Sequence, residues 1–277
     1  MGKYKEEDYK SNVENAWCPG CGNFGILNTV KQTLAELDIG PHQAVICTGI
    51  GQAPKLPHYM KVNTFNGLHG REVASAQGIK MANPELEVIV HGGDGGIYGE
   101  GGNHFLHAIR RNLNITVVVH DNRIYGLTKG QPSPTSELGL VTGIKPEGVQ
   151  ISPLKPLELA ISQECSFVAQ AFSANIKENV EILKAAILNE GFSLVNMLQP
   201  CITWNKVNTY KWFRDNTFKV DSEHDPYDSR ATLELLKDKL PLGIIYKNKK
   251  EAYDSKVARA RVFCGKEGFN KIAGSFG

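Results

Sequence analysis

The sequence lacks any long apolar run. Its longest stretches of apolar residues, such as Ile115 to Val119, have the length of a strand and are far too short to span a bilayer as a helix. The first ten residues, MGKYKEEDYK, are too polar for a signal peptide. We therefore expect a cytoplasmic protein that does not enter the membrane.

The sequence also lacks an excess of charge of either sign. Its 31 Lys and Arg residues nearly balance its 29 Asp and Glu residues, and no basic stretch alternates with aromatic residues as nucleic-acid-binding surfaces require. We do not expect nucleic acid as a partner. With 41% hydrophobic and 22% charged residues, the 277-residue chain has the composition of a globular protein with a sizeable core.

Cysteine is scarce, and its placement is informative. Only Cys18 and Cys21 lie close together in the chain. In a reducing cytoplasm such a pair indicates a metal or redox site rather than a structural disulfide. The other cysteines are Cys47, Cys165, Cys201 and Cys264.

Apolar periodicity predicts alternating strands and helices. Helical spacing is found at about 24–38, 71–81, 104–111 and 177–189, and continuous apolar runs at 44–47, 88–90, 115–119, 167–172 and 194–198. Strands that are apolar along their whole length are typical of a mostly parallel sheet covered by helices on both faces, so we expect an α/β fold.

The pattern weakens in the last quarter of the chain. We divide the sequence into a domain of residues 1–204 and an irregular C-terminal extension of residues 205–277, with a short helix at about 233–240. The extension is expected either to dock on a partner subunit or to form a flexible tail.

Unusual loops follow four of the predicted strands. They read TGIGQ, GGDGG, DNRIYG and QPC. In parallel α/β sheets, ligands bind beyond the carboxyl ends of the strands, so these loops are expected to meet in one site.

Two of these loops carry oxygen ligands. Asp94 lies between Gly93 and Gly95, and Asn122 follows 28 residues later. Magnesium bound to a diphosphate prefers a carboxylate, an amide oxygen and a backbone carbonyl, which Asp94, Asn122 and Ile124 can supply. The glycines allow the backbone to approach the phosphates closely. A helix beginning near Gly101 directs its amide groups toward their negative charge.

The spacing of GDG and asparagine resembles the thiamine diphosphate motif. The wider text WCPGCG, TGIG, LPHY, LHGR, GDGGIYGEGGNHF, NRIYGLTKGQ and QPCITWNK resembles the beta subunit of 2-oxoacid:ferredoxin oxidoreductases over about residues 12–210. The resemblance implies oxidative decarboxylation of a 2-oxoacid with coenzyme A, yielding acyl-coenzyme A, carbon dioxide and reduced ferredoxin. It also implies cofactor contacts at Ile50, Gly51, Gln52, Ala53, His69, Gly93, Asp94, Gly95, Gly126 and Leu127.

The same resemblance implies an iron-sulfur cluster, expected to be of the 4Fe-4S type. Cys18, Cys21 and Cys201 match three cysteine positions of the family, but the fourth, 31 residues after Cys21, is Gln52. A neutral amide is a poor substitute for a thiolate. Cys47 is the nearest spare thiol, and it is expected either to replace that ligand or to pack in the sheet.

The resemblance places the acid that activates the cofactor on another chain. Glu72 and Glu100 adjoin the binding loops, but neither is assigned that role. The family pattern puts a pyrimidine-binding half and its glutamate on an alpha subunit, so the site should lie at a subunit interface. Lys55 and Lys129 are candidates to meet the distal carboxylate of 2-oxoglutarate, which we favour over pyruvate and a broad range of 2-oxoacids.

Two other functions remain open at this point. One is a non-redox thiamine diphosphate decarboxylase or carboligase, which shares the GDG motif but has no use for the cysteines. The other is a binding module stapled by zinc at Cys18 and Cys21, although zinc sites of this kind need a second pair of ligands.

Overall fold

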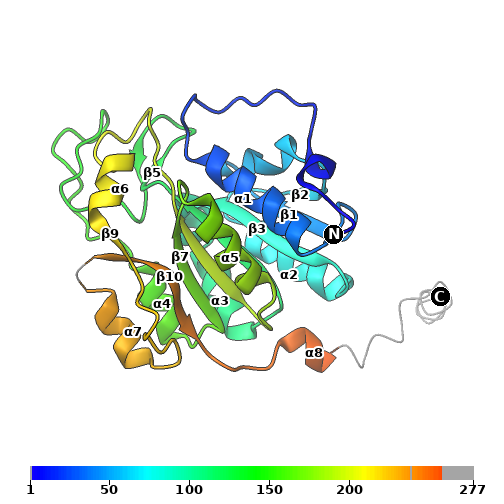
Figure 1. The fold of residues 1–277 in the computed structure, drawn as a ribbon. Coiled ribbons are helices and arrows are strands. Elements are labelled where there is room, and N and C mark those ends of the chain that lie inside the picture. The colour runs from blue at the N-terminus through cyan, green and yellow to red at the C-terminus, as the bar shows by residue number, and fades with distance from the viewer. Residues whose placement is uncertain (1, 238, 258–277) are drawn as a thin grey trace, which may run out of the picture.

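The computed structural model describes residues 2–237 and 239–257, and its centre is an eight-stranded sheet (Figure 1). Every pair of neighbouring strands is parallel except β7 and β10. A separate small hairpin consists of β5 (Ile124–Tyr125) and β6 (Gln131–Pro132). Across the main sheet the order is β2 (Asn63–Asn66), β1 (Ala44–Thr48), β3 (Glu87–Gly93), β4 (Thr116–Asp121), β8 (Ser193–Leu198), β7 (Phe167–Phe172), β10 (Leu240–Lys247) and β9 (Thr217–Lys219).

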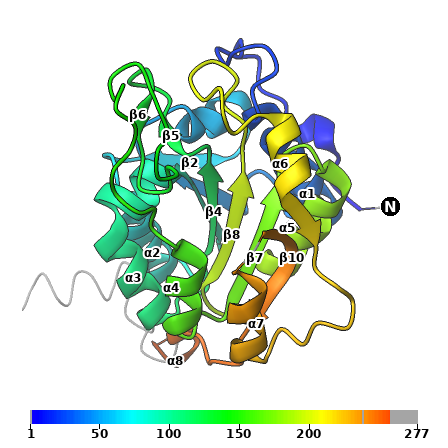
Figure 2. The ribbon, with the colours of Figure 1, turned by 90° about the vertical axis from the view of Figure 1, so that its left-hand side faces the viewer.

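Helices cover both faces of the sheet, as Figure 2 shows. One face carries α1 (Asn23–Glu36) and α5 (Ile176–Ile187). The other carries α2 (Glu72–Ala82), α3 (Gly102–Arg111) and α4 (Pro156–Ser162). The remaining elements are η1 (Glu6–Tyr9), η2 (Ala53–Tyr59), η3 (Gly95–Glu100), α6 (Tyr210–Asn216), α7 (Ser229–Leu235) and α8 (Tyr253–Val257).

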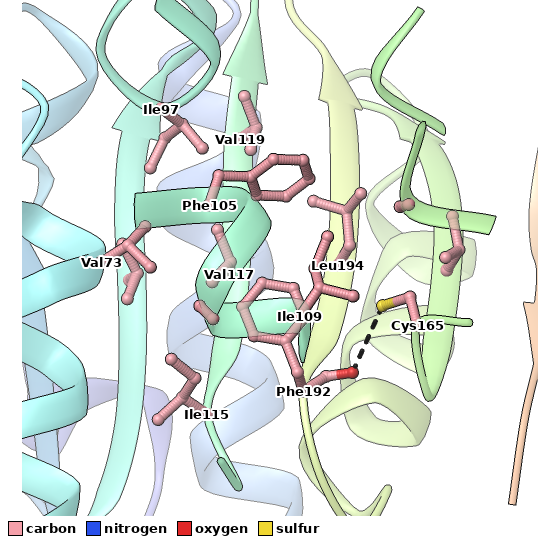
Figure 3. Close-up of a cluster of buried hydrophobic side chains, with 14 of the residues drawn as sticks. Val73, Ile97, Phe105, Ile109, Ile115, Val117, Val119, Cys165, Phe192 and Leu194 are labelled. Atoms are coloured by element: carbon pink, nitrogen blue, oxygen red, sulfur yellow. Dashed lines mark hydrogen bonds between the residues drawn. The ribbon is translucent and has the colours of Figure 1, made fainter. Parts of the chain in front are cut away.

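The apolar core has one large cluster on each face of the sheet. Side chains alternate along a strand, so Val117 and Val119 face α3 whereas Val118 faces the opposite side. On the α3 face, Phe105 lies 6.1 Å from Phe192, ring centre to ring centre, and both are buried (Figure 3). Burial on both faces explains why these strands are apolar along their whole length.

The predicted α/β fold with a mostly parallel sheet is confirmed. Each of the four predicted helices and five predicted strands is present, with ends shifted by a few residues. The polar edge strand β2 was not predicted, because its four residues are exposed and carry no apolar pattern.

The expectation of an irregular C-terminal extension is wrong for its described part. From Leu240, β10 pairs antiparallel with β7, and β9 pairs with β10. This strand could not be recognised from the sequence because Pro241 and Gly243 interrupt its apolar pattern. Its pairing register also shifts between Ile244 and Tyr246. The helix expected at 233–240 is α7, which ends at Leu235.

Parallel pairing places the ends of four strands at one edge. β1, β3, β4 and β8 are consecutive neighbours, so the loops that follow them leave the sheet together. In Figure 2 these loops and the β5–β6 hairpin lie above the sheet. Among the described residues, no helix combines the length and the apolar character needed to cross a membrane.

Candidate functional site

Three of the four predicted loops, those that follow β1, β3 and β4, line one cleft at this edge of the sheet. Every residue predicted to contact a cofactor or magnesium is found in its wall, and the cleft adds Pro54, Gly96, Tyr125 and Thr128. Their convergence is therefore confirmed, whereas their individual roles remain predictions. The lining comprises residues 50–54, His69, residues 93–96, Asn122 and residues 124–128.

Asp94 is a buried carboxylate at the bottom of the cleft, directly after β3. The hydroxyls of Ser133 and Thr135 each lie 2.5 Å from its Oδ2, and Thr135 Oγ1 is also 2.9 Å from Oδ1 of the buried Asp121. Burial raises the pKa of Asp94, and the negative charge of Asp121 raises it further. A threonine hydroxyl can give its one proton to only one carboxylate at a time. A bound cation would compensate this crowded negative charge, so the donor set fits magnesium.

Asn122 and Ile124 are held together after β4. Asn122 Oδ1 accepts a hydrogen bond from the Ile124 amide at 3.0 Å, and Asn122 Nδ2 donates to Gln199 Oε1 at 3.1 Å. These contacts fix the amide oxygen of Asn122 beside the Ile124 backbone, in the same cleft as Asp94. An amide oxygen, a backbone carbonyl and a carboxylate are the oxygen ligands that magnesium accepts.

Glu72 is a second buried acid beneath the binding loops. A Cβ on Gly49 would lie 2.3 Å from its Oε2, and a Cβ on Gly96 would lie 2.8 Å from its Oε1. The loops can pass over this carboxyl because both positions are glycine. Neither oxygen has a hydrogen-bond partner among the described residues, and burial raises the pKa of Glu72 to about 7.

The three cysteines of the predicted cluster belong to two loops that touch each other. Gln199 Nε2 lies 3.6 Å from Cys21 Sγ, and the Thr203 hydroxyl lies 3.1 Å from Cys18 Sγ. Cys201 lies between these two contact residues in the sequence. Cys18, Cys21 and Cys201 are all free thiols that are not fully buried.

This cysteine region adjoins the cleft. A Cβ on Gly126, in the cleft wall, would lie 3.8 Å from Cys201 Sγ. Trp17, directly before Cys18, donates from Nε1 to the backbone oxygen of Gln52 at 2.8 Å. A redox group on these cysteines would therefore sit next to whatever the cleft binds.

The structure does not support Cys47 as a cluster ligand. Its side chain is fully buried among Val45, Val73 and Ala76 on the α2 face of the sheet, whereas Cys21 packs on the α1 face. Burial raises the pKa of the Cys47 thiol to about 12 and that of Cys21 to about 11, so it is the position of Cys47, on the other face of the sheet, that separates it from the other cysteines. Packing in the sheet is the interpretation that the geometry favours.

The remaining predicted residues lie outside the cleft wall. Lys129 is exposed at the tip of the loop that follows Thr128, and Lys55 is half-buried in η2. Cys165 is buried in the core, where its Sγ lies 3.3 Å from the Phe167 carbonyl. Cys264 lies outside the described residues.

Several residues of the site were missed from the sequence. Ser133 and Thr135 reach Asp94 from about forty residues away, and no local pattern marks them for that contact. Tyr125 lies between the predicted residues Ile124 and Gly126, so it could have been found from its place in the loop. Within the described ranges, no three side chains of His, Cys, Asp or Glu, Cys18, Cys21 and Cys201 included, are close enough to hold a single metal ion.

Comparison with known families gives two consecutive matches. The family described as "Thiamine pyrophosphate enzyme, C-terminal TPP binding domain" matches residues 38–197. The family described as the C-terminal part of the pyruvate ferredoxin oxidoreductase beta subunit matches residues 201–261.

Individual relatives agree with these matches. The chain is 40% identical to the beta subunit of 2-oxoacid:ferredoxin oxidoreductase 1 of Aeropyrum pernix, over 91% of this chain and 84% of the relative. It is 43% identical to 2-oxoglutarate oxidoreductase subunit KorB of Mycobacterium tuberculosis, over 73% of this chain and 54% of the relative.

A solved structure is also similar along almost the whole chain. It is the 2-oxoglutarate:ferredoxin oxidoreductase from Magnetococcus marinus with 2-oxoglutarate, coenzyme A and succinyl-CoA bound. The TM-score is 0.92 at 39% sequence identity, covering 99% of this chain and 96% of that chain.

The buried acid Glu72 yields a prediction about stability and pH. Its folded pKa of about 7 lies above the ordinary value of 4.5, so the folded chain binds more protons than the unfolded chain between these values. Stability should therefore fall as pH rises from 4.5 to 7, by up to about 3 kcal/mol from this group. We expect Glu72→Gln to remove this part of the slope in urea unfolding experiments. Glu181→Gln, at an exposed acid, should leave the curve unchanged; an equal change in both variants would contradict the assignment.

Proposed function

The chain belongs to the family of 2-oxoacid:ferredoxin oxidoreductase beta subunits, and we propose that its cleft binds magnesium and the diphosphate of thiamine diphosphate. The observation that carries this proposal is the meeting of Asp94, Asn122 and Ile124 in one cleft. Membership of this family sets aside the non-redox decarboxylase or carboligase and the zinc-stapled binding module. The cofactor, when bound, supplies an electron sink for decarboxylation of the 2-oxoacid.

In this proposal, Asp94, Asn122 and the carbonyl of Ile124 hold the magnesium ion. Ser133 and Thr135 orient the Asp94 carboxylate by their hydrogen bonds, so that its other oxygen can face the metal. The loops containing Gly51 and Gly95 bring backbone close to the phosphates. The start of η3, directly after Asp94, adds amide groups that favour negative charge.

We propose that the site is completed by an alpha subunit lying over this edge of the sheet. Large apolar side chains are exposed around the cleft, including Ile50 at 45%, Leu127 at 42% and Leu68 at 74%. Exposed apolar surface of this kind marks a protein interface. The partner would bring the acid that activates the cofactor, and we propose that the described part of the C-terminal extension, which exposes Tyr227, is a second docking surface for it.

We propose that electrons leave through an iron-sulfur cluster on Cys18, Cys21 and Cys201 and then pass to ferredoxin. Two contacts support this proposal. Cys201 lies against Gly126 in the cleft wall, and Trp17, next to Cys18, donates a hydrogen bond to the backbone of Gln52, which also lines the cleft. Both contacts make the distance for electron transfer short. Gln52 Oε1 is buried without a hydrogen-bond partner among the described residues, so it is available as a non-thiolate fourth ligand. These thiols need a reducing compartment, which agrees with a cytoplasmic enzyme.

We propose 2-oxoglutarate as the preferred substrate. Relatives from four organisms in the comparison carry 2-oxoglutarate in their names, and the Magnetococcus marinus structure holds it. Lys129 follows the cleft residues Leu127 and Thr128 and can supply a cation for the distal carboxylate. Lys55, in the helix after Gln52 and Ala53, is the second candidate.

Asp94→Ala should weaken binding of thiamine diphosphate by about a hundredfold or more, because the phosphate and metal charges lose their buried partner. Calorimetry on the alpha-beta complex with magnesium present measures the affinity. Asp215→Ala, at an exposed acid of α6, is the control and should bind as the wild type does. Near-normal affinity in Asp94→Ala would refute the magnesium assignment.

Steady-state assays with coenzyme A and ferredoxin test the substrate. We expect a higher kcat/KM for 2-oxoglutarate than for pyruvate. Lys129→Ala should reduce the 2-oxoglutarate value about tenfold, the usual scale of a lost charged contact, and leave the pyruvate value unchanged. Lys211→Ala, at an exposed lysine that does not line the cleft, is the control. A clearly higher kcat/KM for pyruvate would overturn the preference.

Iron and acid-labile sulfide in anaerobically purified protein test the cluster. We expect about four irons per beta chain. Cys201→Ala should lose them, whereas Cys47→Ala should keep them, because Cys47 is buried on the other face of the sheet. Iron loss in Cys47→Ala would make that residue a ligand after all. Absence of iron from the wild type would mean that electrons leave through another subunit.

A further inference from the structure

His69, in the wall of the cleft, is paired with the carboxylate of Glu100. His69 Nε2 lies 3.1 Å from Oε2 of Glu100, the last residue of η3. The Tyr125 hydroxyl lies 3.3 Å from each oxygen of the same carboxylate. Burial, followed by the charge of Glu100, raises the pKa of Tyr125 to about 12, so the phenol stays protonated and donates to Glu100.

The turn that carries His69 packs closely against the backbone at Glu100. Gly70 has a positive φ of 72°, and a Cβ there would lie 2.6 Å from the Gly101 amide and 2.7 Å from the Glu100 Cβ. Arg71 Nη1 donates to the Glu100 carbonyl at 3.4 Å. Only glycine allows the turn to approach this closely, and the approach determines which edge of the imidazole meets Glu100.

The other imidazole nitrogen has no partner. His69 Nδ1 is buried, and it makes no hydrogen bond to any of the described residues. It lies beside Gly96, where a Cβ would be 3.4 Å from it, and both residues line the cleft. Because Nε2–H is directed at Glu100, Nδ1 is the nitrogen left for a ligand.

We propose that Glu100 is a positioning residue that holds His69 so that its Nδ1 donates a hydrogen bond to an anionic phosphate oxygen in the cleft. This inference rests on the proposed function. A neutral imidazole that donates through Nε2 presents a lone pair at Nδ1, which would repel a phosphate. Such a hydrogen bond needs a proton on Nδ1 as well as on Nε2, with the Glu100 carboxylate facing the Nε2 edge of the ring.

Other titratable groups near His69 do not replace this pair. Tyr125 approaches from β5 and Arg71 from the same turn, and Glu72 lies beneath Gly96. Arg71 is directed at a backbone carbonyl, and Glu72 is an acid that would repel an anion. Of these groups, His69 is the one that can become a cationic donor toward a phosphate.

Calorimetry on the alpha-beta complex tests the proposal. Thiamine diphosphate is titrated with magnesium at alkaline pH, in buffers of different ionisation enthalpy, so that affinity and protons taken up are both measured. The proteins are wild type, Glu100→Gln, His69→Asn and the double variant. Glu178→Gln on α5, which breaks a comparably exposed ion pair with Lys219, is the control.

We expect Glu100→Gln to bind the cofactor about tenfold more weakly and to lose proton uptake, with no further loss in the His69→Asn background. Glu100→Asp keeps the negative charge on a shorter side chain, so it should recover part of the cofactor affinity and part of the proton uptake. It replaces Glu100→Gln in the experiment if that variant fails to assemble with the alpha subunit. Two results would overturn this inference but not the proposed function. One is that Glu100→Gln binds the cofactor and takes up protons as the wild type does. The other is that Glu100→Gln weakens cofactor binding equally in the presence and in the absence of His69. Failure of the wild type to bind the cofactor would overturn the proposed function as well.

Discussion

In the centre of the molecule, β1, β3, β4 and β8 run side by side in one direction, so their carboxyl ends leave the sheet at the same edge. The cleft depends on this parallel pairing, because β1, β3 and β4 each deliver one loop of its wall and β8 delivers the adjoining loop with Cys201. The strands are buried between two helical layers, which fixes where the loops start. The polar atoms of the site can therefore be held in place by a rigid scaffold, although the loops themselves are irregular.

Charge is the second constraint on this edge of the sheet. Asp94, Asp121 and Glu72 are buried acids within or beneath the loops, and burial raises the pKa of Asp94 and of Glu72. Such a region is costly for the chain alone and is suited to a cation. In the proposed function, magnesium bound with a diphosphate satisfies the acids while the surrounding glycines make space for the phosphates. The loops with Cys18, Cys21 and Cys201 lie against the same region, so in the proposed function the cofactor and the cluster would be neighbours.

The success of sequence reasoning here has a physical basis. The strand at Phe167–Phe172 and the loops at Asp94 and Asn122 could be predicted because a doubly buried strand is apolar throughout and a polar loop after it is conspicuous. β10 could not, because its proline, glycine and register shift break the pattern and its partner β7 lies about seventy residues earlier. The contacts of Ser133 with Asp94 and of Glu100 with His69 also join distant segments. Such pairs arise from tertiary packing, which local patterns do not record.

In the proposed function, Asp94, Asn122 and Ile124 bind one metal ion together with a diphosphate. A crystal structure of the alpha-beta complex with thiamine diphosphate and manganese in place of magnesium tests it, since anomalous scattering locates the manganese directly. We expect one anomalous peak in contact with Asp94, Asn122 and the Ile124 carbonyl, with phosphate oxygens completing its shell. A cofactor bound without such a peak, or a peak away from these three residues, would contradict it.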